Sequence, residues 1–413
     1  MIGRLPQYGH VLTNANVWSH DGKWIVYDVR SRADGSIFDG DRIERVNVGT
    51  GEVQVLYRAE HGAKCGVATC SPVDERVVFI LGPERPTADW EYGPAHRQGV
   101  VWSDGRVVRL EARDLAAPYT PGALRGGSHV HVFSADGEWV SFTYNDAVVH
   151  SEQRNVGVSV FGRAVTPRGR HARNHDGSAF SVLVTQTTAQ PRAGSDEIRR
   201  AFEDAWVGDR GYVRADGMRQ RRAIAFQGEV ITGQGEAISE LFVADLPEDL
   251  TVAGDGLLEG TAERLPAPPS GVVCRRLTRT EGRVFPGLVG SPRHWVRSSP
   301  DGSAIACLMK DEAGVVQIFL VSPRDGEVRQ LTRNAASIGS AFTWSPDGRR
   351  IAHVMDGSVC VTDVASGRTR RVTERQRDGG PGAEACVFSP DGERVAFTRV
   401  TGGWNQVFVV EVG

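Results

Sequence analysis

The sequence predicts an all-β protein, a seven-bladed β-propeller that takes up the whole chain, 1–413, as a single domain. A turn of the form Ser-Pro-Asp-Gly recurs along the chain, alternating apolar strands flank each copy, and a Leu-Thr or Val-Thr pair ends several of the units. Units of roughly 40–60 residues that each hold four strands are typical of propeller blades.

The turn is the clearest of the three signals. Perfect copies occupy 299–302, 345–348 and 389–392, and looser copies begin at Ser19, Ser71, Ser134 and Asn174. Proline presets φ at the second position, and Asp-Gly supplies a side-chain acceptor and a residue that tolerates positive φ. The segments 139–143 and 394–398, which follow two of the turns, read as strands.

The Leu-Thr or Val-Thr pair predicts how the ring of blades is closed. It ends the outer strands at 276–278, 330–332 and 371–373, and it occurs once more near the N-terminus, at 11–13. The last repeat, 383–412, has three strands and lacks the fourth. The N-terminal strand is therefore expected to complete the last blade and close the propeller.

The fourth repeat is irregular, because more than twice the usual interval separates its turn from the next one. We expect an insertion in blade 4, from 188 to 237, with a helix over 195–206 at the channel mouth. Ser195 fits an N-cap followed by two acidic residues, Phe202, Ala205 and Trp206 form an apolar face, and Gly208 ends the segment. The alternative is that 214–217, Arg-Ala-Asp-Gly, marks a degenerate eighth blade.

Composition excludes several classes of protein. The formal net charge of −3 gives no general basic field for nucleic acid. No apolar run approaches the roughly 20 residues that cross a bilayer, and the N-terminus lacks the apolar core of a signal peptide. The six cysteines form no Cys-x-x-Cys pair, which favours a reducing cytoplasm. The oligomeric state stays open.

Histidines gather where the channel is expected. Residues five and three positions before the turn share one face of the innermost strand, because side chains alternate along a strand. Four of the 11 histidines fall at these positions, namely His129, His131, His171 and His294. Imidazoles that converge from neighbouring strands can bind a divalent ion. We expect these four as metal ligands, with structural histidines as the alternative.

Three residues are expected to act on a substrate. His171 is either the fourth ligand or the catalytic base, because a neutral imidazole accepts protons near neutral pH. Arg125 and Arg293 stand close to His129 and His294 in the sequence and can bind a carboxylate or a phosphate through two parallel hydrogen bonds.

Longer segments carry a resemblance to known propellers. They are 12–18, 119–133, 141–146, 191–198 with 206–208, and 292–297. With the Ser-Pro-Asp-Gly repeats, they resemble TolB-type propellers and, more narrowly, the YidR family of bacterial propeller proteins. The stretch 209–222 is longer here than the family pattern.

A more distant resemblance is to oligogalacturonate lyase, a seven-bladed propeller. That family holds a manganese-type ion in its channel, with a Gln-x-x-His-x-His motif. His129 and His131 match the two histidines, whereas Gly126 stands at the glutamine position. The resemblance does not assign His171 or His294, which follow this motif here instead of preceding it.

The functional hypothesis is a metal-dependent lyase that performs β-elimination, or a related isomerase, with its site in the channel. The cofactor would be a divalent ion, manganese first, with zinc, iron or nickel as alternatives. The substrate would be a uronate or a similar polar, acidic or sugar-like molecule, because a metal on a carboxylate stabilises the enolate formed by proton removal. The alternatives are a non-catalytic binding propeller of the TolB or WD type, and a metal-dependent hydrolase.

Overall fold

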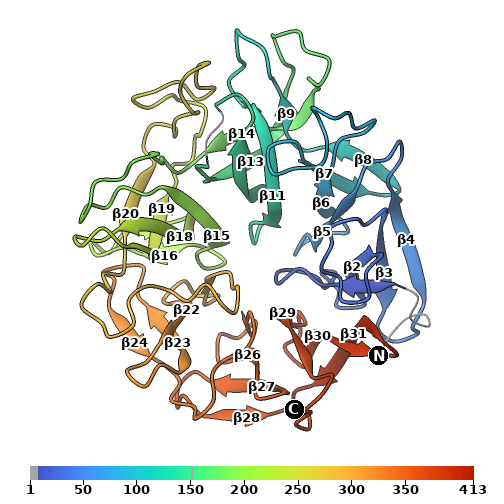
Figure 1. Cartoon of the computed structure of the whole chain (residues 1–413), viewed down its shortest axis with the longest axis vertical. Helices are drawn as coiled ribbons and strands as arrows, with labels where there is room; N and C mark the ends of the chain where they lie inside the picture. The colour runs from blue at the N-terminus through green and yellow to red at the C-terminus, as the bar shows by residue number, and fades with distance from the viewer. Residues whose placement is uncertain (1–7, 150–151) are drawn as a thin grey trace.

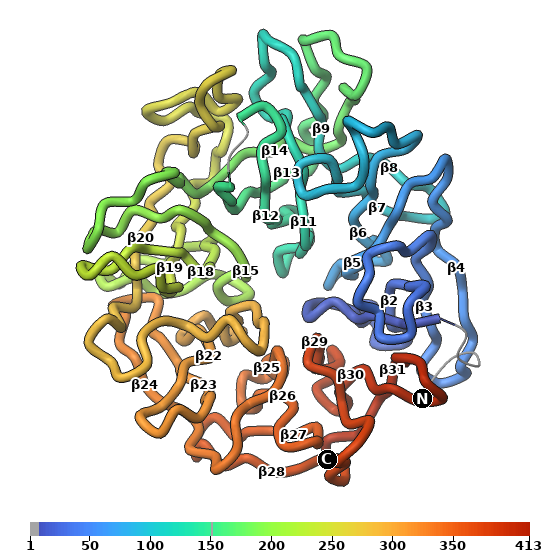
Figure 2. The backbone as a smooth tube through the Cα atoms, viewed as in Figure 1, coloured from blue at the N-terminus to red at the C-terminus, as the bar shows by residue number. Residues whose placement is uncertain are grey.

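A computed structural model describes residues 8–149 and 152–413, and seven antiparallel sheets stand around one axis (Figure 1). The tube in Figure 2 runs once around the ring from blue to red, so that the first and last blades are neighbours. The seven-bladed all-β prediction is therefore confirmed.

The first three blades follow the sequence in order, each from its inner to its outer strand. Their strands are β1 (Gly9–Val11), β2 (Trp24–Arg30), β3 (Arg42–Asn47) and β4 (Val53–Arg58); β5 (Cys65–Cys70), β6 (Val77–Leu81), β7 (Gln98–Ser103) and β8 (Arg106–Arg109); and β11 (Gly126–Phe133), β12 (Trp139–Asp146), β13 (Asn155–Val165) and β14 (Gly177–Leu183). A short parallel pair, β9 (Ala112–Arg113) and β10 (Ala123–Leu124), lies between blades 2 and 3 in the sequence.

The remaining four blades complete the ring. Their strands are β15 (Arg200–Trp206), β18 (Ala223–Ile231), β19 (Ala237–Asp245) and β20 (Val273–Arg276); β21 (Arg297–Ser298), β22 (Ile305–Lys310), β23 (Val316–Val321) and β24 (Val328–Gln330); β25 (Thr343–Trp344), β26 (Arg350–Met355), β27 (Ser358–Asp363) and β28 (Thr369–Arg371); and β29 (Pro381–Phe388), β30 (Arg394–Thr401) and β31 (Trp404–Glu411).

The Ser-Pro-Asp-Gly turns share one hydrogen-bond pattern. The Ser299 hydroxyl donates to Asp301 Oδ1 at 2.6 Å and accepts the Ala304 amide at 3.1 Å. The turns that begin at Ser19, Ser134, Ser345 and Ser389 repeat both contacts. The pattern links the inner strand of each of these blades to the second strand.

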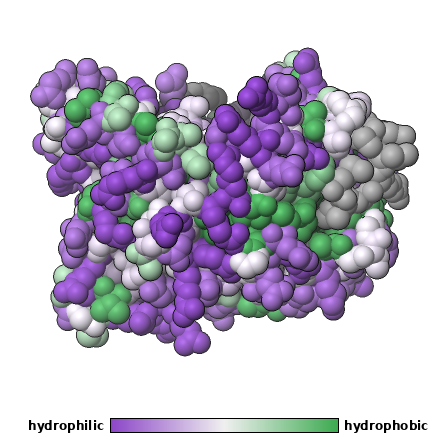
Figure 3. All heavy atoms as spheres, turned by 90° about the horizontal axis from the view of Figure 1, so that it is seen from below, coloured by the Kyte–Doolittle hydropathy of each residue, from purple (hydrophilic) through white to green (hydrophobic). Residues whose placement is uncertain are grey.

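Hydrophobic cores lie between neighbouring blades. One cluster joins blades 4 and 5 through Leu241 and Ile305, and another joins blades 6 and 7 through Val361 and Phe397. The face in Figure 3 is mostly hydrophilic, with hydrophobic atoms in a band at mid-height and in small patches. Middle strands such as β6 and β23 are buried along their whole length, whereas outer strands such as β8 and β28 are largely exposed.

Indole side chains tie the inner strands of adjacent blades together. Trp18 Nε1 donates to the Val387 carbonyl at 3.1 Å, Trp206 Nε1 to Val132 at 3.0 Å and Trp344 Nε1 to Arg297 at 2.9 Å. These bonds join blade 1 to 7, 4 to 3 and 6 to 5. They fix how far each inner strand can slide past its neighbour.

Closure of the ring differs from the prediction. The segment 11–13 was expected on the last blade, but β1 pairs with β2 as the innermost strand of blade 1. Within the described chain the last sheet has three strands, and side chains of β31 bridge the joint instead. The Asn405 amide donates to the His10 carbonyl at 2.9 Å, and the Gln406 amide donates to the Tyr8 carbonyl at 2.8 Å.

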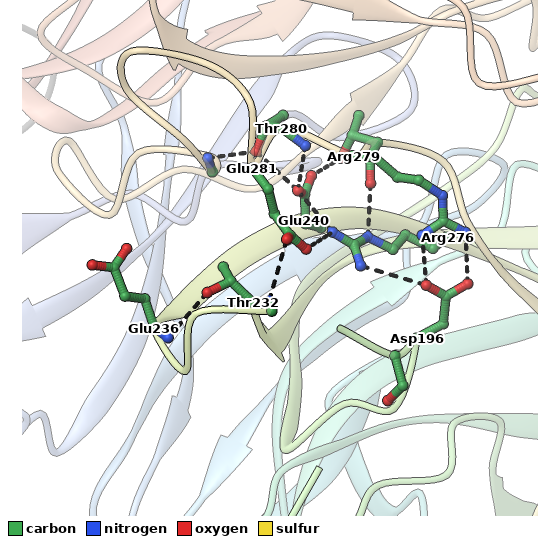
Figure 4. A network of polar contacts seen from close by, with 12 residues as sticks. Asp196, Thr232, Glu236, Glu240, Arg276, Arg279, Thr280 and Glu281 are labelled. Carbon is green, nitrogen blue, oxygen red and sulfur yellow. Dashed lines mark hydrogen bonds and ion pairs between the residues drawn. The ribbon is translucent and has the colours of Figure 1, made fainter. Parts of the chain in front are cut away.

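The predicted helix over 195–206 is wrong, because 200–206 is β15, the inner strand of blade 4. Asp196, expected in the first turn of that helix, instead forms ion pairs. The Asp196 carboxylate accepts both Nη atoms of Arg279, at 2.6 and 2.8 Å, and Arg276 from β20 (Figure 4). None of residues 8–149 and 152–413 forms a helix, so this part of the chain holds no helix that could cross a membrane.

The segment 188–237 is therefore mostly the fourth blade itself, not an insertion. What is inserted is a hairpin between β15 and β18, made of β16 (Tyr212–Val213) and β17 (Arg219–Gln220). The sequence 214–217 forms the tip of this hairpin, so there is no eighth blade among the described residues. The turn at 174–177 leads into β14, the outer strand of blade 3. The prediction had assigned this turn to the fourth repeat, so the strands of blade 4 were expected at the wrong positions.

Glu240 on β19 is the centre of the network in Figure 4. It is fully buried and accepts Arg276 Nη2 at 3.0 Å and the Thr280 amide and hydroxyl at 2.7 and 2.8 Å. We expect Glu240→Ala to lower the free energy of unfolding by about 3–5 kcal/mol, because it leaves a buried guanidinium without its main partner. Urea denaturation followed by circular dichroism measures the change.

The matched control is Glu236→Ala, at an exposed residue of the turn that precedes β19. It should change the free energy of unfolding by less than about 0.5 kcal/mol. Equal effects of the two substitutions would contradict a structural role for the network.

Candidate functional site: an arginine pocket at one channel mouth

The axial channel is closed in its middle and holds a cavity at each end. Ala15, Val130, Val132 and Trp295 form an apolar plug that draws on blades 1, 3 and 5. On the side of the Ser-Pro-Asp-Gly turns lies a cavity of about 390 Å³, lined by all seven blades. On the other side, blades 2 to 5 enclose a cavity of about 370 Å³.

The second cavity, which we call the arginine pocket, combines four arginines with two histidines and one acid. Its polar lining residues are Arg97, His129, Arg154, Arg200, Glu203, Gln227, Arg293 and His294. Four positive charges face one negative charge, because both histidines are neutral as shown below. The pocket is therefore strongly cationic although the whole chain is slightly acidic.

Three of these guanidinium groups carry an unsatisfied donor. The Nε atoms of Arg97, Arg154 and Arg200 are buried and have no hydrogen-bond acceptor in the part of the chain that the structure describes. Burial lowers the pKa of Arg97 and lowers that of Arg154 to about 10, so both cations are poorly solvated. Buried donors of this kind cost free energy until an acceptor reaches them.

Glu203 on β15 is the resident anion of the pocket. Its Oε1 accepts Arg293 Nε at 2.7 Å, while its buried Oε2 has no hydrogen-bond partner within the described ranges. Glu203 has φ of 53°, in the left-handed region that residues with a Cβ rarely adopt. The backbone there forms a β-bulge against β18, which turns the side chain into the pocket.

His129 reaches the pocket in the same way, from the bulge on β11 at Val130, where φ is 52°. Burial lowers the pKa of His129 well below its ordinary value, and the charges on Arg97, Arg154 and Arg293 lower it further. Its Nδ1 is buried with no partner among the residues described. His129 is therefore a neutral imidazole surrounded by cations at physiological pH.

His131 does not join His129. Its Nε2 lies 2.8 Å from Glu111 Oε1, both side chains are buried, and Glu111 Oε2 accepts the Gly99 amide at 2.7 Å. The bulge at Val130 breaks the alternation that placed both histidines on one face. His131 is thus held in the packing between blades 2 and 3.

His294 also lines the arginine pocket, but both of its ring nitrogens contact neighbouring backbone. Nδ1 is 3.3 Å from the Pro292 carbonyl, and Nε2 accepts the Leu308 amide at 3.1 Å. Both nitrogens are occupied, so His294 is a structural residue and not a ligand. The prediction had His294 and Val296 facing the channel. In the structure the alternation along this segment is shifted by one residue, so Arg293, Trp295 and Arg297 face the channel.

The structure places the other two predicted site residues, His171 and Arg125, away from the arginine pocket. His171 lies in an exposed loop that precedes β14, where its Nδ1 accepts the Arg173 amide at 3.1 Å. Arg125 is fully buried in an ion pair with Asp146 at 3.0 Å and donates to the Thr261 and Arg264 carbonyls. Of the predicted catalytic residues, only Arg293 lines the pocket.

The four predicted ligands therefore do not meet. No group of three or more histidine, cysteine, aspartate or glutamate side chains within residues 8–149 and 152–413 is arranged to hold a metal ion. The residues that sequence reasoning missed are Arg97, Arg154, Arg200, Glu203 and Gln227. Arg200, Glu203 and Gln227 were missed because the strands of blade 4 were predicted at the wrong positions. Arg97 and Arg154 were missed because nothing distinguishes them among the 45 arginines of the chain.

These features define a seven-bladed β-propeller with a cationic pocket at one mouth of a plugged channel. The chain belongs to the YidR family, since it is 48% identical over 410 residues to the uncharacterised protein YidR of Escherichia coli K12. That match covers 97% of this chain and 94% of YidR. A family model described as a protein of unknown function, DUF3748, matches residues 64–175.

Two solved structures share the fold. An oligogalacturonate lyase in complex with manganese has a TM-score of 0.58 at 12% identity, over 98% of this chain and 90% of that one. A puromycin-hydrolysing peptidase of Mycobacterium tuberculosis has a TM-score of 0.50 at 15% identity, over 95% of this chain. This chain covers 50% of that peptidase. Both likenesses concern the fold alone.

The buried histidines predict how stability depends on pH. Burial lowers the pKa of His294 to about 4, so the unfolded chain binds this proton first. Stability from this group is present above about pH 6.5 and is lost as the pH falls toward 4. Between pH 7 and 4.5 we expect His294 to contribute a loss on the order of 2 kcal/mol.

Urea denaturation at both pH values tests this, with His294→Gln as the variant. The variant should show a smaller loss between pH 7 and 4.5 than the wild type. The control His171→Gln changes an exposed imidazole and should leave the loss as it is. An unchanged pH dependence in His294→Gln would refute the assignment.

Proposed function

We propose that the arginine pocket binds a carboxylate-bearing sugar of the uronate type and that His129 removes a proton beside that carboxylate. The reaction class is β-elimination by a lyase, or the isomerisation that begins with the same step. The observation that supports this most directly is that Arg97, Arg154 and Arg200 carry buried donors without acceptors in the same pocket as His129, whose Nδ1 is also without a partner among the described residues.

The arginines would bind and polarise the substrate. A guanidinium matches a carboxylate through two parallel hydrogen bonds, and the buried donors of Arg97, Arg154 and Arg200 offer such bonds in a poorly solvated setting. Negative charge develops on the carboxylate as the adjacent C–H bond breaks, because the electron pair moves into an enediolate. Cations already in place stabilise that charge without reorganisation.

His129 would accept the proton. Its low pKa keeps the imidazole neutral in the free protein, and a bound anion raises that pKa by offsetting the surrounding arginine charges. The base thus becomes stronger when the substrate is present. In a lyase the β-substituent then leaves with the electron pair; in an isomerase the carbanion takes a proton back at another position.

Manganese does not enter this scheme, although the solved oligogalacturonate lyase contains it. His131 and His294 have ring nitrogens engaged by Glu111 and by backbone, and His171 lies in an exposed loop. These residues do not fit a shared metal ion, so the proposed charge stabilisation rests on arginine. The metal-dependent version is tested separately below.

The central test is His129→Gln, assayed on a panel of uronate substrates. Ultraviolet absorbance detects the unsaturated products of elimination. We expect kcat to fall by roughly 10²–10⁴-fold, because a positioned general base supplies about that factor. The affinity for the uronate should change only a few-fold, since arginines supply the binding. His171→Gln should behave as the wild type.

The outcomes separate the alternatives. Binding without turnover in the wild type would indicate a non-catalytic binding propeller, and turnover of esters or lactones instead of elimination would indicate a hydrolase. Loss of activity on chelation, restored by manganese and coupled to stoichiometric metal in the wild type, would contradict the metal-free scheme. Absence of uronate binding would refute the proposal itself.

The arginines predict a distinct phenotype. Arg154→Met and Arg200→Met should each weaken uronate binding by about tenfold or more, because a charged hydrogen bond of about 1.5–3 kcal/mol is lost. Isothermal titration calorimetry measures this directly. Arg210→Met is a suitable control, since Arg210 lies outside the arginine pocket.

The pH profile follows from the low pKa of His129. The acid limb of kcat/KM reports the free protein and should lie well below pH 6.5, because His129 protonates only there. The acid limb of kcat reports the complex and should lie at higher pH, since the bound anion raises the pKa. Coincident limbs would contradict coupling between the imidazole and the bound carboxylate.

A further inference from the structure

The cavity on the turn side of the channel has a layered lining. Its rim carries four prolines of the recurring turns, namely Pro72, Pro300, Pro346 and Pro390. One layer deeper stand aromatic residues just before the turns, Trp18, Phe133, Trp206, Trp344 and Phe388. This wall is apolar and rigid, because three of its indoles are hydrogen-bonded to neighbouring blades.

Arg297 lies below the aromatic layer, two residues before the turn of blade 5. Its Nη2 donates to the Asn14 carbonyl of blade 1, and its Nη1 makes a poor contact of 3.4 Å to the Val296 carbonyl. No carboxylate of the described chain forms an ion pair with it. Burial lowers the pKa of Arg297 to about 10, against the opposing charges of Asp204 and Glu203.

The cavity is separate from the arginine pocket. Arg293, Trp295 and Arg297 alternate along one segment: the first faces the arginine pocket, the second belongs to the apolar plug, and the third faces the turn side. A ligand on one side does not contact the residues that bind a ligand on the other side.

We propose that this second cavity binds a small carboxylic acid with an aromatic body. Arg297 receives the carboxylate, and the tryptophan and phenylalanine layer packs around the ring. The charges of Asp204 and Glu203 act on Arg297 without forming an ion pair with it, so a ligand carboxylate can make the direct contact with the guanidinium. A volume of about 390 Å³ suits a small molecule.

The charge of the ligand follows from the lining. Arg297 is the single arginine or lysine among the lining residues, and the other ionisable lining residues are His20, Cys70 and Asp209. One cation matches one carboxylate. The arginine pocket, with four arginines and one glutamate, instead favours a more highly charged, polar molecule.

The experiment compares 3-phenylpropionate with its neutral analogue 3-phenylpropionamide on the full-length wild-type protein. Isothermal titration calorimetry and tryptophan fluorescence should show saturable binding of the acid, and the amide should bind at least tenfold more weakly. In Arg297→Met the acid should lose at least tenfold in affinity and approach the amide.

Arg200→Met is the matched control, because it removes one cation from the other cavity. It should weaken uronate binding and leave the affinity for phenylpropionate within about twofold, whereas Arg297→Met should do the reverse. The proposal is overturned by equal binding of acid and amide, by no saturable binding, or by loss of phenylpropionate in Arg200→Met alone. If Arg297→Met does not fold, Arg297→Lys decides, since it must still prefer the acid over the amide.

Discussion

Seven inner strands have to line one axis, and the hydrogen bonds that pass from blade to blade decide how they do so. The indoles of Trp18, Trp206 and Trp344 each donate to a carbonyl on the neighbouring inner strand. A strand that slipped by one residue would lose such a bond and would turn its apolar face away from the core. Both channel cavities depend on this register, because their side chains project from the same strands.

The arginine pocket sits where the inner strands are least regular. Asn16, Val67, Val130 and Glu203 occupy the inner strands of blades 1 to 4, and all have positive φ. For a β-branched residue such as valine this conformation costs on the order of 1–3 kcal/mol. The bulges redirect neighbouring side chains, so His129 and Glu203 face the pocket instead of the blade interfaces.

Electrostatics links this geometry to the proposed chemistry. Arg97 and Arg154 are held in poorly solvated positions, at a cost that the blade cores offset. Burial and, after it, these charges lower the pKa of His129 and keep the imidazole neutral, and a bound carboxylate would offset the charges. An acidic substrate would thus relieve the unsatisfied donors and activate the base in one event. By the same reasoning, the cavity that holds Arg297 and an aromatic wall would prefer a carboxylic acid with a single negative charge and an aromatic body.

The sequence by itself determined the propeller, the seven blades and the family, because turn chemistry and strand alternation are local and repeat along the chain. Tertiary structure decided the site. Whether Arg200–Trp206 is a helix or an inner strand depended on pairing with β18. Whether His129 or His131 faces the cavity depended on a one-residue bulge. Local pattern carries no information on such long-range pairing, and a shift of one residue exchanges every side chain between cavity and core.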